Sequence, residues 1–209
     1  MYTPNSFLVS DQSTLFDWVE RWPFGKLITC QRGQLDINSY PFLLDRDNRM
    51  LLSHMARANP QWQRLMMADD LAVCFEGPHG YVSPRWYSQP DGVPTWNYLS
   101  IQVSGRAELI KTGSEARSVL ERLTEISEEH YGDGWQLQEL NESVLTQLLK
   151  SLVFFRIHIE GITGKAKLSQ NRSSMDRVGV IRQLQQQPDS QLQQLAALMK
   201  DALRQTRGD

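Results

Sequence analysis

The amino-acid sequence predicts an α+β protein built on a mainly antiparallel sheet, of the closed or split barrel kind. About six segments with the two-residue period of β-strands fall within residues 1–110. One further strand pattern returns at 153–160, and helical patterns separate the strands and occupy the C-terminus. The chain has 209 residues, of which 40% are hydrophobic, so it can bury a core without disulfides or a structural metal.

The first half of the chain mixes helices with short strands. A helix begins after the cap residues at 10–13 and ends near Pro23, because its apolar side chains recur every three or four residues. From Gly25 the period changes to two, and a turn at 31–33 joins two strands into a hairpin. The further elements expected are a strand at 50–54, a helix at 60–67, a strand at 71–75, a turn at 77–80, a loop at 84–94 and a strand pair at 96–110 that is broken at Gly105.

The second half begins with two helices, expected at 116–132 and 144–152. A half-buried strand follows at 153–160 and ends at the glycines Gly161 and Gly164. Two more helices form a tail, one behind a capping box at Ser173 and one after Pro188. The expected organisation is a split-barrel domain at 1–172 with inserted peripheral helices, and a helical C-terminal tail at 173–209.

Charge and composition limit the kinds of partner and the cellular compartment that we expect for this protein. Lys and Arg number 22 against 24 Asp and Glu, so the formal charge of −2 offers few phosphate contacts and direct DNA binding is not expected. The start lacks a basic leader, and no run approaches the ~20 apolar residues of a membrane span. Cys30 and Cys74 lie in apolar, β-prone segments, which predicts buried, reduced thiols. We therefore expect a cytoplasmic protein with no membrane partner.

Several catalytic signatures are absent from the sequence. It contains neither a Walker A loop nor G-x-G-x-x-G, and no G-x-S-x-G elbow supports an activated serine. Its histidines, His54, His79, His130 and His158, lack the spacing of a zinc site, so no metal is expected. The sequence alone therefore identifies no catalytic residue.

Two polar segments lie where strands are expected to end. Residues 53–60 lead from a strand into a helix, where free backbone N–H groups and Arg57 are suited to a phosphate; an ordinary strand-to-helix turn is the alternative. Residues 165–172 carry three cations, a hydroxyl and two amides, a set suited to a phosphate and the polar edge of a heterocycle. A solvated basic loop is the alternative there. The aromatic stretches at 81–87 and 94–98 belong to the core, to an interface or to the walls around a flat ring.

Four uncommon strings then identify a resemblance that covers most of the chain. They are Asn-Pro-Gln-Trp at 59–62, Gly-Pro-His-Gly-Tyr-Val-Ser-Pro-Arg-Trp-Tyr at 77–87, Val-Pro-Thr-Trp-Asn-Tyr at 93–98 and Lys-Leu-Ser-Gln-Asn-Arg at 167–172. In this order they resemble the PaiB family, described as FMN-binding negative transcriptional regulators. That family is similar to the pyridoxamine-phosphate-oxidase-like split barrels, which are homodimers that bind FMN in clefts at the subunit interface.

The resemblance implies FMN as the cofactor and a set of residues that bind it. It puts Ser53, His54, Met55 and Ala56 beside the isoalloxazine, Arg57 and Asn59 near the phosphate, Lys165, Lys167, Ser169, Gln170 and Asn171 along the polar edge of the flavin, and Trp96 and Asn97 on the facing wall, supplied by the partner subunit. Thr29, Ser39 and Tyr40 are weaker candidates. The chain lacks the arginine-and-lysine strand signature of true pyridoxamine phosphate oxidases, so vitamin B6 oxidation is not expected.

The function expected from the resemblance is that of a cytoplasmic FMN-binding homodimer that represses transcription. Since the sequence shows no helix-turn-helix, a regulator of this kind needs a protein partner or acts through a ligand. A flavin-dependent oxidoreductase or flavin reductase is the first alternative, in which the cofactor carries the hydride chemistry. A split barrel that binds haem is the second.

Overall fold

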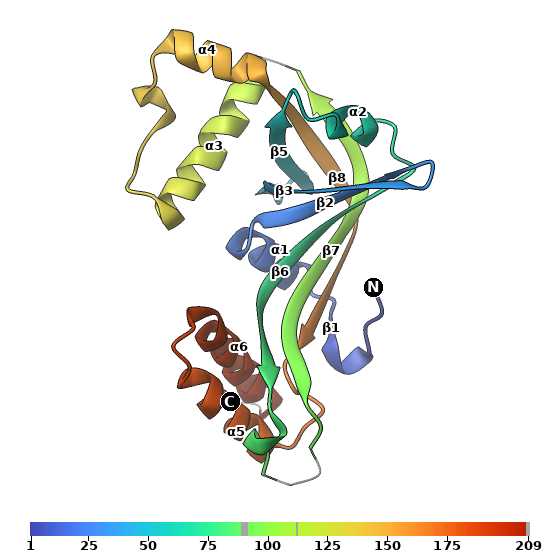
Figure 1. Ribbon diagram of the computed structural model, residues 1–209, viewed down its shortest axis with the longest axis vertical. Coiled ribbons are helices and arrows are strands. Elements are labelled where there is room, and N and C mark those ends of the chain that lie inside the picture. Colours follow the sequence, from blue (N-terminus) through green and yellow to red (C-terminus); the bar gives the residue numbers. More distant parts are fainter. Residues whose placement is uncertain (89–91, 112, 208–209) are drawn as a thin grey trace. The chain divides into compact units, whose positions relative to one another are not determined.

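The computed structural model describes residues 1–88, 92–111 and 113–207, which form an α+β fold (Figure 1). An eight-stranded sheet has the order β3-β2-β6-β7-β8-β5-β4, with β1 paired to β8. The strands are β1 (Leu8–Val9), β2 (Phe24–Gln31), β3 (Gln34–Pro41), β4 (Leu43–Asp45), β5 (Met50–Ala56), β6 (Asp70–Val82), β7 (Thr95–Ile110) and β8 (Leu152–Lys167). Every pairing with a resolved register is antiparallel, and the described strands do not close into a ring. The predicted fold class is confirmed.

Helices occupy the places that the sequence patterns indicate. They are α1 (Gln12–Arg21), α2 (Gln61–Leu65), α3 (Ser114–Tyr131), α4 (Glu142–Ser151), α5 (Ser174–Gln185) and α6 (Ser190–Arg207), with 3₁₀ turns η1 (Asn5–Phe7), η2 (Pro84–Trp86) and η3 (Leu137–Glu139). Side chains cap the N-termini of α4 and α5. Asn141 accepts a hydrogen bond from the backbone N–H of Ser143, and Ser173 accepts one from the backbone N–H of Asp176. The part of the chain described by the structure holds no helix long and apolar enough to span a membrane.

The hairpin β2–β3 is built by a two-residue turn. Arg32 and Gly33 have φ angles of 50° and 79°, and Gln31 pairs with Gln34 across the turn. Positive φ at both central residues is the geometry of the type I′ turn, which matches the twist of paired strands. The expected hairpin is confirmed.

Glycines that predicted turns and breaks instead lie inside three long strands. β6 runs through 77–80, β7 continues past Gly105, and β8 passes Gly161 and Gly164 to end at Lys167. A Cβ at Gly105 would lie 1.9 Å from the His158 carbonyl oxygen, so the glycine allows two backbones to approach closely. The predicted turn at 77–80, the break at Gly105 and the strand end at 161–164 are therefore wrong.

The residues divide into two compact units, which we describe separately. The first comprises 1–15, 76–101 and 163–209, and the second comprises 16–75 and 102–162. In the second unit, α3 and α4 pack on β4, β5 and β8 around an apolar cluster that includes Leu52, Val119 and Phe154. The expected boundary between 172 and 173 falls inside the first unit. Part of the predicted loop at 84–94, residues 89–91, lies outside the described residues.

Both cysteines are free thiols, as expected for a protein without disulfides. Cys30 and Cys74 are half-buried rather than buried, because they alternate along β2 and β6 with the buried residues and so lie on the opposite face. The expectation of complete burial is wrong.

Candidate functional site

The end of β5 presents neighbouring side chains to opposite faces of the sheet, as strand geometry requires. His54 pairs across the ladder with Phe154, and the two ring centroids are 5.5 Å apart. The Nδ1 atom of His54 is buried without a hydrogen-bond partner, and burial lowers the pKa of this imidazole. Met55 points the other way, with its sulfur 3.8 Å from the Tyr40 hydroxyl. His54 and Met55 therefore do not share one wall.

Arg57 is bound to the end of α4. Its Nε donates to the Lys150 carbonyl and its Nη2 to the Leu152 carbonyl, both at 2.8 Å. A cation at a helix C-terminus satisfies carbonyls that lack helical partners. Ala56 pairs with Leu152 in the same ladder. The phosphate role predicted for Arg57 stays a prediction, and this geometry gives the side chain a structural one.

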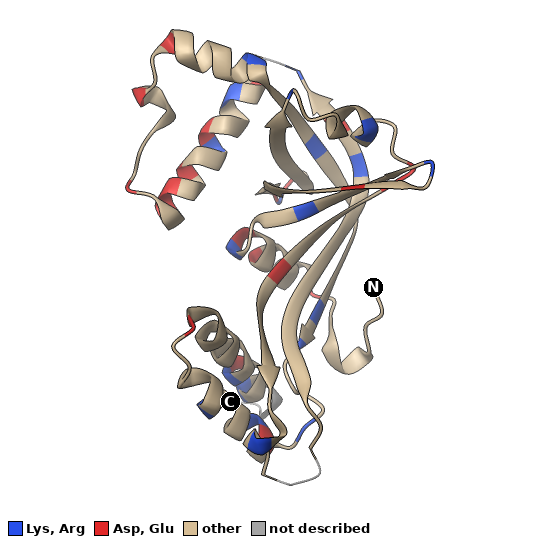
Figure 2. Ribbon diagram, in the orientation of Figure 1, with Lys and Arg blue, Asp and Glu red and all other residues tan. Residues whose placement is uncertain are grey.

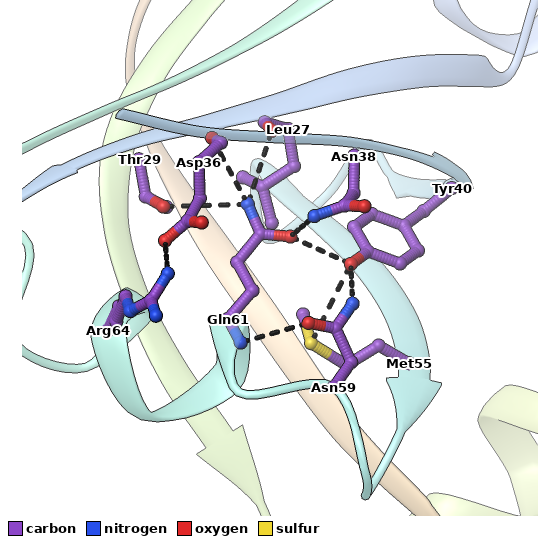
Figure 3. Close-up of polar contacts among 9 residues, drawn as sticks. All are labelled: Leu27, Thr29, Asp36, Asn38, Tyr40, Met55, Asn59, Gln61 and Arg64. Atoms are coloured by element: carbon purple, nitrogen blue, oxygen red, sulfur yellow. Dashed lines mark hydrogen bonds and ion pairs between the residues drawn. The ribbon is translucent and has the colours of Figure 1, made fainter. Parts of the chain in front are cut away.

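Asn59 belongs to a hydrogen-bond network centred on the buried side chain of Gln61, shown in Figure 3. Gln61 is 1% exposed, and its Oε1 accepts from the Tyr40 hydroxyl at 2.7 Å and from the Asn38 amide at 2.9 Å. Its Nε2 donates to the Leu27 carbonyl, to Thr29 Oγ1 and to the Asp36 carbonyl at 3.3–3.4 Å. We call Leu27, Thr29, Asp36, Asn38, Tyr40, Asn59 and Gln61 the Gln61 network.

The network connects α2 to the β2–β3 hairpin. Asn59 donates to the Tyr40 hydroxyl at 2.8 Å and accepts from the Gln61 backbone N–H at 3.0 Å. Burial raises the pKa of the Tyr40 phenol. The sequence prediction missed Gln61, although its spacing to Leu65 indicates a buried helical face, since residues four apart share a face and Leu65 is buried.

In the first unit, Trp96 and Asn97 also face opposite sides of their strand. Asn97 is 0% exposed, and its Nδ2 donates to Ser169 Oγ at 2.9 Å and approaches the sulfur of Met199 on α6 at 3.4 Å. Ser169 adopts a φ of 63°, and its hydroxyl lies within 3.2 Å of Asn97 Oδ1. Asn97 and Ser169 thus link the sheet to the loop after β8. Their predicted contact with FMN stays a prediction that this packing does not favour.

The opposite face of these strands is aromatic and open. Trp96 is 55% exposed and Tyr81 is 45% exposed, with their ring centroids 6.0 Å apart. The ring of His79 lies 6.4 Å from that of Trp96. A cavity of about 300 Å³ is lined by Glu76, His79, Trp96, Tyr98, Leu99 and Ser100. The two aromatic stretches singled out in the sequence therefore meet on one surface.

Lys165 and Lys167 lie on β8 itself and not on a loop after it, because the strand continues to Lys167. They alternate with the buried residues Ala166 and Leu168, so both lysines face away from the interior. Lys165 Nζ lies 5.4 Å from the ring centroid of Tyr98 and donates to the Tyr2 carbonyl, while Lys167 donates to Thr95 Oγ1. We call His79, Tyr81, Trp96, Tyr98, Lys165 and Lys167 the aromatic–lysine face.

The remaining two predicted residues follow this strand. Gln170 closes on its own segment, accepting from the Leu168 N–H at 2.7 Å and donating to the Ala166 carbonyl at 2.6 Å. Asn171 is exposed. The structure therefore brings Trp96, Lys165 and Lys167 onto one face of the first unit and turns Asn97 and Ser169 into its interior. His54, Met55, Ala56, Arg57 and Asn59 belong to the second unit.

This fold and these surfaces define a class of protein. It is an α+β protein with an open antiparallel sheet, and the described residues contain no group of three His, Cys, Asp or Glu that could hold a metal. Residues 1–161 match the family described as "Putative FMN-binding domain", and the chain belongs to this family. It is 34% identical to the protease synthase and sporulation protein PAI 2 of Bacillus subtilis over 206 residues, 98% of this chain and 99% of the relative. The predicted PaiB-like membership is confirmed.

Solved structures support the fold. The flavocytochrome Anf3 from Azotobacter vinelandii has a TM-score of 0.59 at 18% identity, with 77% of this chain and 69% of that chain covered. The FAD and haem binding protein from Mycobacterium smegmatis has a TM-score of 0.58 at 16% identity, with 82% and 78% covered. Identities this low confirm the architecture alone.

FMN is the cofactor of this family, and the aromatic–lysine face fits its chemistry. The cofactor combines a flat ring with an anionic phosphate. The exposed indole of Trp96 offers a surface on which a ring can stack, and the ammonium groups of Lys165 and Lys167 are suited to charge-assisted hydrogen bonds with phosphate. In the second unit, the unpartnered Nδ1 of His54 is the buried polar atom left available for a ligand among the predicted residues there.

Proposed function

We propose that this protein binds FMN through the aromatic–lysine face. Trp96 stacks on the isoalloxazine, and Lys165 and Lys167 hold the phosphate or the polar edge of the ring. The observation that carries this proposal is an indole 55% exposed beside two outward-facing lysines. Contiguous exposed apolar patches mark binding surfaces, and the exposed rings of Tyr81 and Trp96 are in contact. Bound flavin supplies hydride and electron chemistry, while these residues bind and orient it.

Within the second unit, taken by itself, His54 is an alternative candidate for a contact with a flavin. Its buried Nδ1 lacks a partner, and an unsatisfied buried polar group is costly unless a ligand or water meets it. Met55 and Ala56 are weaker candidates, because the side chain of Met55 is turned into the core and the Ala56 carbonyl accepts from the backbone N–H of Asn59 at 2.9 Å. The polar atoms of Arg57 and Asn59 are already engaged within the protein, which makes both weaker candidates.

A homodimer completes the proposal. Phe24, Leu35 and Ile37 are exposed on one face of the β2–β3 hairpin, and β3 is the last strand at its end of the sheet. An exposed apolar edge of this kind is stabilised by covering it, and a second copy of the chain supplies a matching surface. We expect an interface of roughly 2,000 Å² or more. Light scattering that reports a monomer at micromolar concentration with FMN present contradicts the dimer.

The proposed role is the negative regulation of transcription in the cytoplasm. The name of the Bacillus subtilis relative links that protein to protease synthesis and sporulation. A formal charge of −2 disfavours nonspecific DNA binding, so the protein acts through a protein partner or a ligand. The alternative functions are a flavin-dependent oxidoreductase and a haem-binding split barrel, and the titles of the two solved structures name flavin or haem for those proteins.

The absorbance spectrum of freshly purified protein separates these functions, because flavin, haem and empty protein absorb differently. Turnover of a reduced nicotinamide by the flavin-loaded protein favours the oxidoreductase, and its absence favours the regulator. To locate the site, Trp96→Ala is compared with Trp135→Ala, which changes an exposed tryptophan of the second unit. We expect FMN affinity to fall about fivefold or more in the first variant alone, since ring stacking contributes about 1–3 kcal/mol. Equal affinities in the two variants contradict the proposed face.

A further inference from the structure

The second unit contains a cavity that the proposed flavin contacts do not use. Its volume is about 400 Å³, and it lies where α3 faces β4, β5 and β8. Its polar wall consists of Asp45, Asn48, Glu115, Ser118, Arg122 and Arg156, and its floor is apolar, with side chains from β4, β5 and α3. All of these residues belong to one compact unit.

The sequence places the polar wall by simple periodicity. Glu115, Ser118 and Arg122 are three and four residues apart on α3, so they follow one face of the helix. Arg156 pairs with Leu52 across the β5–β8 ladder and points toward the same helix, where its Nη2 donates to the Glu115 carboxylate. Asp45 ends β4 and accepts from the backbone N–H of Asn48 at 3.1 Å. Three separate segments thus converge on the cavity.

Opposite charges line this cavity in equal number. Hydrogen bonds from Asn48, followed by the positive charge of Arg122, lower the pKa of the Asp45 carboxyl. Arg156 has a side chain that is only 19% exposed, and its Nε is buried without a hydrogen-bond partner. Two guanidinium groups and two carboxylates therefore surround an apolar floor, and the formal charges that line the cavity sum to zero. Figure 2 shows both signs of charge along α3.

We propose that this cavity binds a small zwitterion, a free α-amino acid with an apolar side chain. The carboxylate of the ligand meets Arg122 and Arg156, its ammonium meets Asp45 and Glu115, and its side chain packs on the apolar floor. A ligand with only a carboxylate meets attraction from the two guanidinium groups offset by repulsion from the two carboxylates, and the reverse holds for a bare amine, whereas a zwitterion can place each charge beside its opposite. A volume of about 400 Å³ lies within the range of ligand sites.

The ligand acts as an effector, because none of the side chains that line the cavity is one proposed to bind FMN, although Leu52 and His54 lie on the same face of β5. It occupies the side of β5 and β8 that carries Phe154 and the inserted helices, so it rigidifies the packing of α3 on the sheet. This inference stands independently of FMN binding, since it rests on a different set of side chains.

Calorimetric titration of the full-length protein, saturated with FMN, tests the proposal. The probes are L-leucine and L-methionine, compared with 4-methylpentanoate, which lacks the ammonium group, and 3-methylbutylamine, which lacks the carboxylate. We expect saturable binding of at least one amino acid at about 10 mM or below, and at least tenfold weaker binding of both analogues. Absence of saturable binding by both amino acids, or binding of an analogue as tight as that of the amino acid, overturns the proposal.

Two variants at exposed positions of α3 separate binding from folding. Arg122→Ala is expected to weaken amino-acid binding about tenfold or more. Arg117→Ala is the matched control, because Arg117 lies on the same helix but pairs with Glu121 and Glu142 outside the cavity. Ser118→Phe fills the cavity from its rim and is expected to abolish binding while the melting temperature without amino acid changes by less than about 3 °C. Unchanged affinity in both Arg122→Ala and Ser118→Phe overturns the assignment.

Discussion

The aromatic–lysine face and the Gln61 network both contain residues that were expected to bind the cofactor. They differ in how far their side chains are already hydrogen-bonded within the protein. In the Gln61 network, every predicted group has a partner within the protein: Asn59 and Tyr40 bond to each other and to Gln61. On the aromatic–lysine face, Trp96 is exposed. The ammonium groups of Lys165 and Lys167 donate to the Tyr2 carbonyl and to Thr95 Oγ1, and each ammonium has three N–H donors in all. A residue type suited to a ligand is therefore a candidate only when the fold leaves its polar atoms available.

The alternation of strand residues explains much of this difference. Trp96 and Asn97 are neighbours in sequence, but the first is exposed and the second is bonded to Ser169 in the interior. His54 and Met55 divide in the same way between two faces of β5. A ligand that lies on one face of a sheet meets every second residue, so a run of consecutive strand residues does not form one wall.

The largest expected effect is on stability, in the Gln61 network. Gln61→Ala removes an amide that bonds to five groups and leaves several buried polar atoms without partners. We expect the free energy of unfolding to fall by about 2–4 kcal/mol, measured by urea denaturation. Gln63→Ala is the control, since Gln63 is exposed on the same helix and its loss should cost less than about 0.5 kcal/mol. A similar cost in both variants would show that the network does not stabilise the fold.

The next effect is on ligand binding, on the aromatic–lysine face. Lys167→Ala is expected to weaken FMN binding about ten- to a hundredfold, because it removes a charge-assisted hydrogen bond to an anionic cofactor. Its ligand-free melting temperature should stay close to that of the wild type, since the side chain is only half-buried. Lys111→Ala serves as the control at an exposed lysine of the second unit. If FMN raises the melting temperature of Lys167→Ala as much as that of the wild type, the lysine does not contact the cofactor.

A third effect depends on pH and concerns His54. Burial lowers its pKa below the ordinary value of 6.5, so the folded state binds fewer protons than the unfolded state. Its contribution to stability is therefore complete above the unfolded pKa and is lost as pH falls below it, with a slope of at most about 1.4 kcal/mol per pH unit. His54→Gln should lose less stability than the wild type between pH 7 and pH 5 in urea titrations. Parallel profiles for the two proteins would contradict a buried, neutral histidine.

The sequence predicted the order of the helices and strands well, because that order follows from periodicity and caps. The predicted strand ends were wrong at the glycines, because glycine occurs both in turns and where two backbones approach closely. Gly105 is an example of the second kind, since it lies beside the His158 carbonyl in the middle of a strand. The residue types at 165–172 predicted a phosphate site that includes Lys165 and Lys167, and the resemblance to a family predicted the flavin, but neither indicated which side chains share a face with the two lysines. Whether a polar atom is free to bind a ligand depends on tertiary packing. The hydrogen-bond partners of Arg57 and Asn97 therefore could not be predicted from the sequence.

The smallest effect tests where the Gln61 network ends. Arg64 forms an ion pair with Asp36, whose backbone carbonyl accepts from Gln61, but the side chains of Arg64 and Asp36 are 41% and 24% exposed. Water screens a pair at the surface, so Arg64→Ala should cost less than about 1 kcal/mol of unfolding free energy and leave FMN affinity unchanged. A double-mutant cycle with Asp36→Asn measures the coupling directly. A coupling energy above about 2 kcal/mol would show that the Arg64–Asp36 ion pair belongs to the Gln61 network. Strong polar interactions would then reach the solvent-exposed edge of that network, and burial would not separate it as clearly from the aromatic–lysine face.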